Sequence, residues 1–439
     1  MRIAIATNFL YPDKLGGTEI YCKNLIESLI SLGHEVYWIV PNFNKSENIN
    51  YINENNIQVI KFATVENNLS NEIIISNSFI NEINNLKIQI VHFHEFGGPE
   101  GICASLLENV KKNGFTTIVT LHILNYICQT STLKYGSRSF CEGVFIPNRC
   151  AACRLFSDKT KIKFIDYSLT NIAYLFFNIT ESCFKSNKLI SNKFIYFKKP
   201  ALLINSINNY SDVVITLNDW FNKILVANKF TKEKIFKINQ AVPEINNENT
   251  KYKIDNSERT NYVFVGRLEK EKGIDLILKV ANKLNKKNSN IYIDLYGPLN
   301  IKNREIYLKK INKIKNVTYK GILNPESVVN ILKQYKAVLL PSTVNEMSPL
   351  IIMQANIVKT PVIASDVFGS KELINKYDCG ILFPNGSLND FSKCINSIEK
   401  NELTFKFISN IEDSFLNIAK KHATIYSLYI NKTKTLVQD

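Results

Sequence analysis

The sequence predicts an α/β protein of two Rossmann-like domains that face each other across a cleft. Short apolar runs, which are typical of buried parallel strands, alternate with segments of helical periodicity in both halves of the chain. A turn containing glycine follows the first strand of each half and precedes a helix. A polar segment rich in Asn, Glu and Lys, residues 244–258, separates the halves and is predicted to be the linker.

The first half begins with a predicted strand at 2–6, which runs into a polar loop and therefore does not resemble the apolar core of a secretory signal. Gly16 and Gly17 precede a helical pattern, with Thr18 as the expected N-cap and Gly33 at the end. Glycines at this place let a ligand approach the backbone, and the helix N-terminus attracts anions. Further strands are predicted at 36–40, 57–62, 88–93, 116–121, 213–217 and 235–238.

Two turns of the second half carry charged side chains. The strand at 261–265 is followed by Gly266 and Arg267, and Lys272 precedes a helix at 274–284. Arg267 and Lys272 flank a helix N-terminus, which predicts a diphosphate clamp. A solvated charge run is the alternative, and it describes the intervening Lys270 and Glu271 better. Further strands are predicted at 291–296 and 317–320, and a helical tail at 405–428.

The stretch 337–374 reads as strand, loop, helix and strand, which is one unit of a parallel sheet. Ligands of such sheets bind beyond the carboxyl ends of the strands, at helix N-termini. Glu346 and the backbone amides of 347–350 are therefore expected where a phosphate and a sugar could bind together, with Pro349 in the first helical turn.

Size, charge and cysteine content limit the class of protein. The 439 residues suffice for two or three domains, and 54 Lys and Arg against 39 Asp and Glu give a net charge of +15. This surplus suits nucleotide diphosphates, anionic lipid headgroups or nucleic acid without separating them. Because no apolar run approaches the ~20 residues of a spanning helix and no export signal is evident, we expect a cytoplasmic protein, with the inner face of the membrane as its candidate docking surface. The nine cysteines then indicate reduced thiols or a metal site.

The stretch around Glu346 resembles the donor-binding signature of the retaining glycosyltransferase family four, which has the GT-B fold. The family pattern is a Glu, seven residues, and a second Glu on a helix; here Glu346 matches the first acid and Gln354 stands at the second. The resemblance implies that Glu346 contacts the donor sugar and that Gln354 lies at the nucleotide ribose, where it keeps a carbonyl but lacks the charge. Lys359 stands where the family usually has a helix-ending Gly, and a left-handed Lys costs roughly 1 kcal/mol.

The resemblance covers nearly the whole chain and implies roles for other residues. Arg267 and Lys272 would bind the donor diphosphate and stabilise the leaving group, and His122, at the end of a central strand, would lie near the donor sugar. His92 and His94 are expected to be structural. No catalytic metal is expected, because a convincing Asp-x-Asp motif is absent from the sequence. The remaining implied donor contacts are Gly16, Gly17, Gly266, Ser348, Pro349 and Leu350.

The expected domains are an acceptor-side domain at 1–243 with a cysteine-rich insertion at 123–155, a nucleotide-sugar domain at 259–404, and a helix at 405–439 that crosses back to the first domain. Within the insertion, Cys128, Cys141, Cys150 and Cys153 end in a C-x2-C pair. Four thiolates in 26 residues could close a tetrahedral zinc site, which would be structural because every ligand position is filled. Their other spacings are looser than in common zinc ribbons, and four reduced thiols in a folded loop are the alternative.

The stretch 159–203 mixes aromatic residues with lysines. Such a mixture suits a helix lying on an anionic membrane surface, or stacking on single-stranded nucleic acid. Amphipathic helices that cover the sheet and keep their lysines in water are the third alternative. The resemblance favours the membrane over nucleic acid, because acceptors of bacterial family members are often lipid-linked.

The sequence thus predicts a retaining glycosyltransferase that moves a sugar from a nucleotide-diphosphate donor to a glycan or lipid-linked acceptor in surface polysaccharide synthesis, with no nucleic-acid partner. Two hypotheses of other classes stand beside it. A catalytically weak sugar-nucleotide-binding scaffold is suggested by Gln354 and Lys359, and a zinc- and nucleic-acid-binding protein by the cysteines and charge. The motifs do not specify the sugar, the nucleotide or the acceptor.

Overall fold

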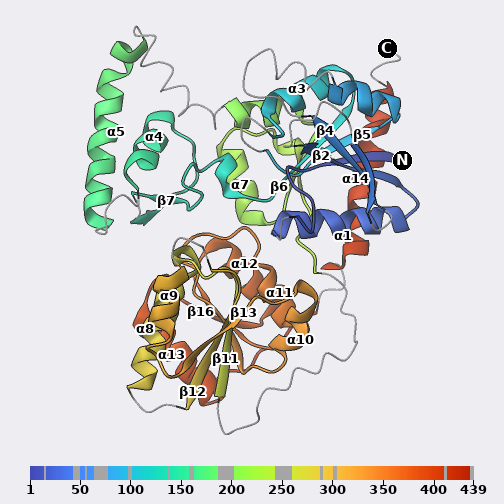
Figure 1. The fold of residues 1–439 in the computed structure, drawn as a ribbon. Coiled ribbons are helices and arrows are strands. Elements are labelled where there is room, and N and C mark those ends of the chain that lie inside the picture. The colour runs from blue at the N-terminus through green and yellow to red at the C-terminus, as the bar shows by residue number, and fades with distance from the viewer. Residues whose placement is uncertain are drawn as a thin grey trace. The chain divides into compact units, whose positions relative to one another are not determined.

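The chain folds into two compact units (Figure 1). Unit 1 comprises Met1–Gln240 together with Ser414–Asp439, and unit 2 comprises Ala241–Asp413. The computed structural model describes residues 1–13, 16–42, 50–54, 57–63, 78–96, 101–136, 138–157, 163–185, 202–242, 260–286, 290–299, 304–409 and 413–435. The linker predicted at 244–258 lies outside the described residues.

Unit 1 is built on an eight-stranded sheet in the order β10-β9-β6-β5-β1-β2-β4-β3. All neighbours are parallel except β3, which pairs antiparallel with β4. β1 lies between β2 and β5, so the strand order reverses at β1, and in open parallel sheets ligands commonly bind at such a point. The strands are β1 Arg2–Ala6, β2 Glu35–Asn42, β3 Asn50–Glu54, β4 Ile57–Ala63, β5 Ile90–Phe93, β6 Thr116–Leu121, β9 Val213–Thr216 and β10 Ile235–Lys237.

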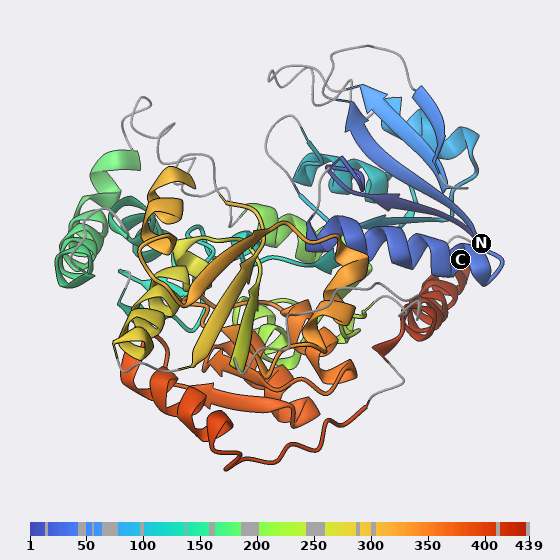
Figure 2. The ribbon, with the colours of Figure 1, turned by 60° about the horizontal axis from the view of Figure 1, so that its bottom comes forward.

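The helices of unit 1 include one from each end of the chain. α14 lies beside α1 (Figures 1 and 2), so the last helix rejoins the first unit as predicted. The predicted N-cap at Thr18 is wrong: Gly16 is the N-cap, and Thr18 is buried inside the first turn. Gly33, at φ 83°, follows the end of the helix as predicted. The helices are α1 Gly17–Ser31, α3 Ala104–Lys112, α7 Asp219–Ala227 and α14 Phe415–Thr435.

A separate lobe of unit 1 contains the cysteine-rich insertion. It consists of the hairpin β7 Lys134–Tyr135 and β8 Ser139–Phe140, and the helices α4 Pro147–Phe156 and α5 Lys163–Lys185 (Figure 1). α4 packs against α5. No described helix, including the long α5 and α14, has the length and hydropathy needed to cross a bilayer.

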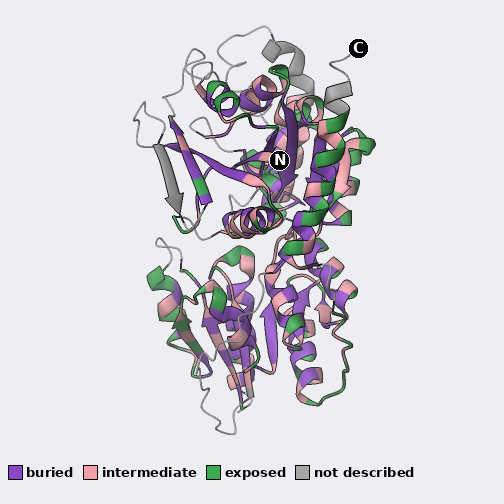
Figure 3. Cartoon of the chain, turned by 90° about the vertical axis from the view of Figure 1, so that its right-hand side faces the viewer, coloured by how far each residue is buried: buried purple, intermediate pink, exposed green. Residues whose placement is uncertain are grey.

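Unit 2 is built on a six-stranded parallel sheet in the order β13-β12-β11-β14-β15-β16. Side chains of β11 alternate between two apolar clusters: Tyr262 and Phe264 join one, Val263 and Val265 the other, so both faces of the sheet are buried (Figure 3). The strands are β11 Thr260–Val265, β12 Ile291–Tyr296, β13 Val317–Gly321, β14 Ala337–Leu340, β15 Val362–Ser365 and β16 Gly380–Phe383. The helices are α8 Ile274–Asn285, α9 Arg304–Ile311, α10 Val328–Leu332, α11 Leu350–Ile357, α12 Phe368–Tyr377 and α13 Leu388–Glu399.

The predicted boundary between 404 and 405 is wrong. Residues 402–409 are not helical and remain with unit 2, and the helix begins only at Phe415. The physical reason is an alternation of period two: Phe405 packs on one apolar cluster of unit 2 and Phe407 on the other. The N–H of Ile408 donates to the carbonyl of Tyr377 at 2.8 Å, which ties the segment to the end of α12.

Candidate functional site

The order in which strands are added to the sheet of unit 2 reverses at β11, which has β12 on one side and β14 on the other. In an open parallel sheet, ligands bind beyond the carboxyl ends of the strands at such a point. The loop after β11 carries Gly266, Arg267 and Lys272, and the loop after β14 carries Glu346. The topology therefore brings the predicted clamp and the predicted sugar-binding acid to the same edge of one sheet.

A glycine lets these two loops touch. Gly273 follows a 3-10 turn at Lys270–Lys272 and has φ 81°, a left-handed conformation that favours glycine. A Cβ at this position would lie 1.9 Å from the carbonyl oxygen of Pro341, the first residue after β14. The N–H of Thr343 also donates to the carbonyl of Glu271 at 2.8 Å. Backbone contact therefore fixes the spacing of the loops before any side chain is considered.

An ion pair joins the two loops across 74 residues of sequence. Nζ of Lys272 lies 2.7 Å from Oε2 of Glu346, with side-chain exposures of 23% and 10%. The hydroxyl of Ser342 donates to the other carboxylate oxygen. Both oxygens of Glu346 are therefore bonded, and the carboxylate is held in one orientation.

Glu346 remains ionised in spite of its burial. Burial alone would raise the pKa of Glu346, but the charge and hydrogen bond of Lys272, the Ser342 hydrogen bond and the Arg267 charge together lower this pKa below its ordinary value. The site therefore presents a fixed carboxylate beside an ammonium group.

Arg267 is the exposed member of the predicted clamp. Its side chain is 62% exposed, and its Nη1 lies 3.2 Å from a carboxylate oxygen of Glu269. An exposed pair of this kind contributes little to stability, so the guanidinium can exchange Glu269 for an anionic ligand at small cost.

The helix after Glu346 begins one residue later than the sequence analysis placed it, because Pro349 is extended and does not enter the first helical turn. Pro349 is the N-cap and Leu350 the first residue of α11, and Ser348 precedes them in the loop. Gln354 lies one helical turn after Leu350 and is partly exposed. Lys359 follows the helix at φ 57°, so the position does adopt the left-handed conformation that the family pattern assigns to Gly.

Sequence reasoning missed two residues that hold Glu346 in place. Ser342 was not recognised because a serine after a strand is common and only the fold shows its hydroxyl at the carboxylate. Gly369, in α12, was missed as well: a Cβ there would lie 2.1 Å from the carbonyl oxygen of Glu346. Its signal was a glycine inside a helical pattern, which often marks close backbone approach.

Unit 1 has its own cluster at the ends of β5 and β6. His94 and His122 follow these strands, and a 2.9 Å hydrogen bond joins Nδ1 of His94 to Nε2 of His122. His92, within β5, bonds the hydroxyl of Tyr426 on one nitrogen and that of Thr120 on the other, each at 2.7 Å. The structural role predicted for His92 therefore agrees with its contacts.

A fourth histidine of this cluster comes from α14. Nε2 of His422 lies 2.9 Å from the hydroxyl of Tyr21 on α1, and the four imidazoles are buried. Burial lowers the pKa of His122 to about 3 and that of His422 to about 3. Burial, and then the neighbouring imidazoles, lower the pKa values of His92 and His94 well below the ordinary range. His122 is therefore a neutral hydrogen-bonding group.

The same cluster contains a trio that could hold a metal ion. Cys22, His94 and His122 each offer one ligand atom, and these atoms lie within 4.8 Å of one another. The two histidines already bond each other, so a metal there would have to displace that hydrogen bond.

The glycines predicted to contact the donor lie at the start of α1. Gly16 is the N-cap and Gly17 the first helical residue. A Cβ on Gly16 would lie 2.2 Å from Oε2 of Glu19, so this buried carboxylate folds back over the helix start. Gly16 and Gly17 belong to unit 1, whereas Gly266 and the ion pair belong to unit 2.

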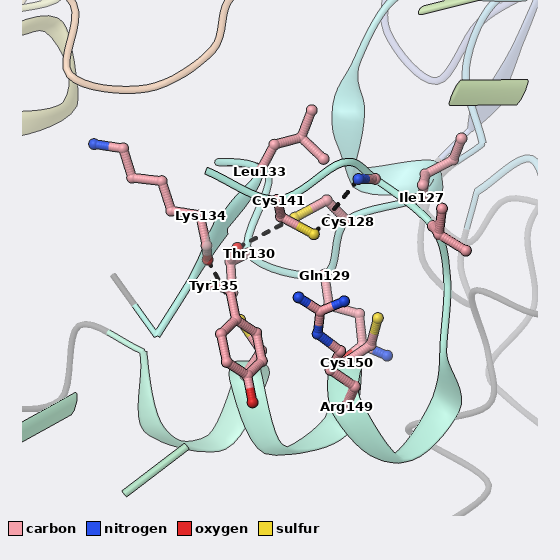
Figure 4. Close-up of a pocket in the computed structure, with 13 residues that line it drawn as sticks. Ile127, Cys128, Gln129, Thr130, Leu133, Lys134, Tyr135, Cys141, Arg149 and Cys150 are labelled. Carbon is pink, nitrogen blue, oxygen red and sulfur yellow. Dashed lines mark hydrogen bonds between the residues drawn. The ribbon is translucent and has the colours of Figure 1, made fainter. Parts of the chain in front are cut away.

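The four cysteines of the insertion line a single cavity of the lobe (Figure 4). All four are free thiols. Burial raises the pKa of the Cys150 thiol to about 12 and also raises the pKa of Cys153. The fold thus gathers four cysteines that are spread over 26 residues of sequence.

The outward face of α5 is apolar. Asp166, Thr170 and Ala173 are buried, whereas the exposed positions carry large apolar side chains. The lysines of the stretch 159–203 lie outside the described side chains, so the alternative in which they face water stays open. The exposed residues, between 36% and 63% accessible, are Phe164, Ile165, Leu169, Ile172, Leu175 and Phe176.

Both units match glycosyltransferase families. Residues 15–148 match the family described as Glycosyltransferase Family 4, and residues 245–414 match the family described as Glycosyl transferases group 1. The second match contains Arg267, Lys272, Glu346 and Gln354, and the first contains His122.

Two curated proteins are similar to the chain. The "Poly(ribitol-phosphate) alpha-N-acetylglucosaminyltransferase" of Staphylococcus aureus is 27% identical over 231 residues, which cover 52% of this chain and 44% of that enzyme. The chain thus spans less than half of this relative. The "Uncharacterized glycosyltransferase MJ1607" of Methanocaldococcus jannaschii is 23% identical over 98% of both chains.

Solved structures share the fold over almost the entire chain. A glycosyltransferase from Rickettsia africae superposes with a TM-score of 0.64 at 14% identity, over 98% of each chain. Sucrose-phosphate synthase from Thermosynechococcus elongatus gives 0.62 at 13%, over 100% of this chain and 98% of that one. Anabaena HepE in complex with UDP gives 0.58 at 12%, over 100% of each. At these identities the likeness shows the GT-B fold.

Proposed function

We propose that this chain, which has the GT-B fold and matches glycosyltransferase family models in both units, transfers a sugar, with retention of anomeric configuration, from a nucleotide-diphosphate donor to a glycan or lipid-linked acceptor in surface polysaccharide synthesis. In this proposal unit 2 binds the donor and unit 1 the acceptor. The observation that carries it is the 2.7 Å contact between Lys272 and Glu346 at the topological reversal of unit 2.

The contact suits the donor because a single oxygen joins its sugar to its diphosphate. Groups that bind the two parts must therefore be adjacent, one cationic and one accepting hydrogen bonds from hydroxyls. Lys272 and Arg267 supply the cations. Glu346 is ionised, each of its carboxylate oxygens has one partner, and it supplies the hydrogen-bond acceptor for the sugar hydroxyls. Gln354 would reach the ribose, with Gly266, Ser348, Pro349 and Leu350 as backbone contacts.

In the transfer step the bond between the anomeric carbon and the diphosphate oxygen breaks, and negative charge grows on that oxygen. Arg267 and Lys272 stabilise this charge, which is the main catalytic contribution. The acceptor hydroxyl bonds to the anomeric carbon on the same face, and its proton passes to the departing diphosphate. No second carboxylate at glycosidase spacing is required. His122 would hydrogen-bond the sugar as a neutral imidazole, beside Gly16 and Gly17.

The ligands bound by structural neighbours suggest which donor to try first. Structures of Anabaena HepE hold UDP and, in a second case, UDP-glucose. We therefore place UDP-sugars at the head of a panel of nucleotide sugars.

The test is thermal stabilisation by each nucleotide sugar, followed by turnover of those that bind. A ligand that binds only the folded state raises the melting temperature with its concentration. Arg267→Ala should weaken the stabilisation and abolish transfer, whereas Lys270→Ala, an exposed lysine three residues away, should change neither. NMR of the product reports the anomeric configuration. Stabilisation by no nucleotide sugar, or inversion, would overturn the corresponding part of the proposal.

The scaffold hypothesis predicts a different result from the same panel. Because Gln354 lacks the charge of the family's second acid, a scaffold would bind the donor without transfer or hydrolysis. Gln354→Glu adds a charge-assisted contact to the ribose and should tighten donor binding severalfold. Turnover in the natural protein that disappears in Arg267→Ala excludes the scaffold.

We further propose peripheral contact with an anionic membrane through the outward face of α5. Its exposed apolar residues recur every three or four positions, which makes one stripe along the helix. Lysines at sequence positions 159, 161, 163, 185 and 188 flank the stripe, and the chain has a net charge of +15, so anionic headgroups are the complementary surface.

Vesicle cosedimentation tests this contact. Protein should bind phosphatidylglycerol vesicles more strongly than phosphatidylcholine vesicles, and Ile172→Ser with Leu175→Ser should reduce binding at least tenfold. Ile306→Ser with Ile322→Ser, which removes equally exposed apolar groups from unit 2, is the matched control. Equal vesicle binding by both double variants would contradict the proposal.

A further inference from the structure

We propose that Cys128, Cys141, Cys150 and Cys153 bind one structural zinc ion that holds the lobe of unit 1 together. The proposal uses only residues of the lobe, so its test does not depend on whether the chain transfers a sugar. It selects the metal-binding alternative for the cysteine cluster over four reduced thiols in a folded loop.

The secondary structure places the four thiols in two pairs, one on either side of the hairpin and one on α4. Cys128 precedes the hairpin of β7 and β8, and Cys141 follows β8 directly. The N–H of Cys141 donates to the carbonyl of Leu133 at 2.8 Å, so the hairpin returns the chain toward Cys128. Cys150 and Cys153 lie three residues apart on α4, which places both on one face of that helix.

All four cysteines face one cavity, which Figure 4 shows with its lining side chains. The thiols bond neutral groups: Gly143 N–H donates to Cys141 Sγ at 3.5 Å, and Cys153 Sγ donates to the Lys134 carbonyl at 3.4 Å. Hydroxyls lie 3.3 Å from Cys128 Sγ, on Thr130, and 3.2 Å from Cys153 Sγ, on Ser157. No three of these described cysteines have their sulfurs within 4.8 Å of one another. Sulfurs around a bound zinc lie about 4 Å apart, so binding requires the side chains to turn toward the centre of the cavity.

The surroundings of the cavity suit a zinc–thiolate centre, which carries a charge of about −2. Arg149 and Lys134 line the same cavity and supply positive charge. Cys150 lies at the end of the first turn of the ten-residue α4, where the positive end of the helix offsets part of the burial that raises the pKa of its thiol. This charge compensation distinguishes the site from an ordinary group of buried thiols.

α4 packs on α5, and Asn228 bonds the backbone of Gly143 and Phe145, but the described contacts between the hairpin and α4 involve few buried apolar side chains. Phe140 and Ile146 are exposed. Small modules of this kind usually need a metal or a disulfide to fold stably. A zinc ion would join the segment before the hairpin, the segment after it, and α4.

The experiment is the zinc content of the full-length chain, purified without chelator, measured by elemental mass spectrometry. One zinc per chain is expected in the natural protein. Cys150→Ser with Cys153→Ser should lose it, whereas Cys103→Ser, a partly buried cysteine outside the lobe, should keep it. A third variant, Cys22→Ser, tests the rival trio of Cys22, His94 and His122.

Each outcome decides the proposal. Zinc absent from the natural protein, retained in the Cys150/Cys153 variant, or lost in Cys22→Ser would overturn it. Because the double variant could fail to fold, cobalt substitution of the natural protein provides a second measurement. Four-thiolate coordination gives a tetrahedral cobalt spectrum with intense sulfur-to-metal bands, whereas the trio, with a single sulfur, would give weak ones.

Discussion

Both units place ionisable groups beyond the carboxyl ends of two neighbouring parallel strands, but the chemistry of the two places differs. Beyond β11 and β14 of unit 2, an ammonium and a carboxylate form a 2.7 Å pair. Beyond β5 and β6 of unit 1, histidines form a buried, uncharged cluster. The fold therefore fixes where a ligand can bind, whereas the partner of each ionisable group decides whether the place is charged or neutral.

The difference has a simple electrostatic cause. Lys272 compensates the burial of Glu346, so the carboxylate keeps its charge and its pKa is lowered. For His92 and His94 the strongest influences after burial are other imidazoles, which lower the pKa further. One site is ready for a charged ligand, and the other holds its groups neutral.

The largest expected effect is acid sensitivity of unit 1. The histidine pKa values are lowered on folding, so the unfolded chain binds more protons below its ordinary pKa of about 6.5. Stability should therefore be complete above pH 6.5 and fall below it. Each histidine that stays neutral in the folded unit costs about 1.4 kcal/mol per pH unit, and four together cost about 5.6 kcal/mol per unit, so unit 1 should unfold within a few pH units of 6.5. Both tryptophans, Trp38 and Trp220, lie in unit 1, so urea unfolding followed by their fluorescence reports that unit.

The control for this prediction is His422→Gln. Glutamine can still hydrogen-bond Tyr21 but does not titrate, so the slope of stability against pH should fall by about one quarter. Unit 2, followed by hydrogen exchange of its own peptides, should keep its stability until the carboxylate of Glu346 titrates, below its ordinary range. Parallel loss of both units between pH 6.5 and 5 would remove the distinction.

The second largest expected effect is the loss of stability of unit 2 when one member of the Lys272–Glu346 pair is removed. Lys272→Ala leaves Glu346 buried without its cation and should destabilise unit 2 by about 3 kcal/mol. Adding Glu346→Gln removes the stranded charge and should restore much of this stability but no transfer activity. Denaturant unfolding of the two single variants and the double variant measures the coupling, and additive losses would mean that the pair is not coupled.

A smaller effect should follow from the contact between the two loops of unit 2. Gly273→Ala meets the Pro341 carbonyl and also strains φ, so a loss of about 2 kcal/mol is expected. Gly321→Ala has the same left-handed strain with open space around it and should cost about 1 kcal/mol. Thermal unfolding compares the two, and equal losses would show that the loop contact is dispensable.

The smallest expected effect is a gain. Lys359 is left-handed after α11, so Lys359→Gly should stabilise unit 2 by up to about 1 kcal/mol. Asn401→Gly is the control, because asparagine tolerates its positive φ better and should gain less. The melting temperatures of both variants decide this, and a loss in Lys359→Gly would mean that the lysine side chain contributes more than its backbone costs.

The sequence predicted the parallel-sheet architecture and the charged site because both depend on local patterns. Short apolar runs marked the strands 116–121, 291–296 and 337–340 with the bounds that the structure has. Lys272 and Glu346 each stood at a helix N-terminus after such a run, so strand topology was enough to bring them together.

The histidine cluster was not predictable in the same way. His422 and Tyr426 meet Tyr21 and His92 across more than 300 residues, and no local pattern marks a helix that completes a distant unit. The start of that helix was also misplaced, because apolar residues at 405 and 407 alternate between two clusters of unit 2 and yet fit a helical pattern. Long-range contacts of this kind follow only from the complete fold.

The return of α14 to unit 1 has a consequence for biosynthesis. During translation an amino-terminal domain ordinarily folds as soon as it leaves the ribosome. Here Tyr21 and His92 must wait for His422 and Tyr426, which are synthesised after the whole of unit 2. The first unit to emerge is therefore the last to be completed, and a nascent chain stalled before residue 414 would expose the face of α1 that the final helix covers.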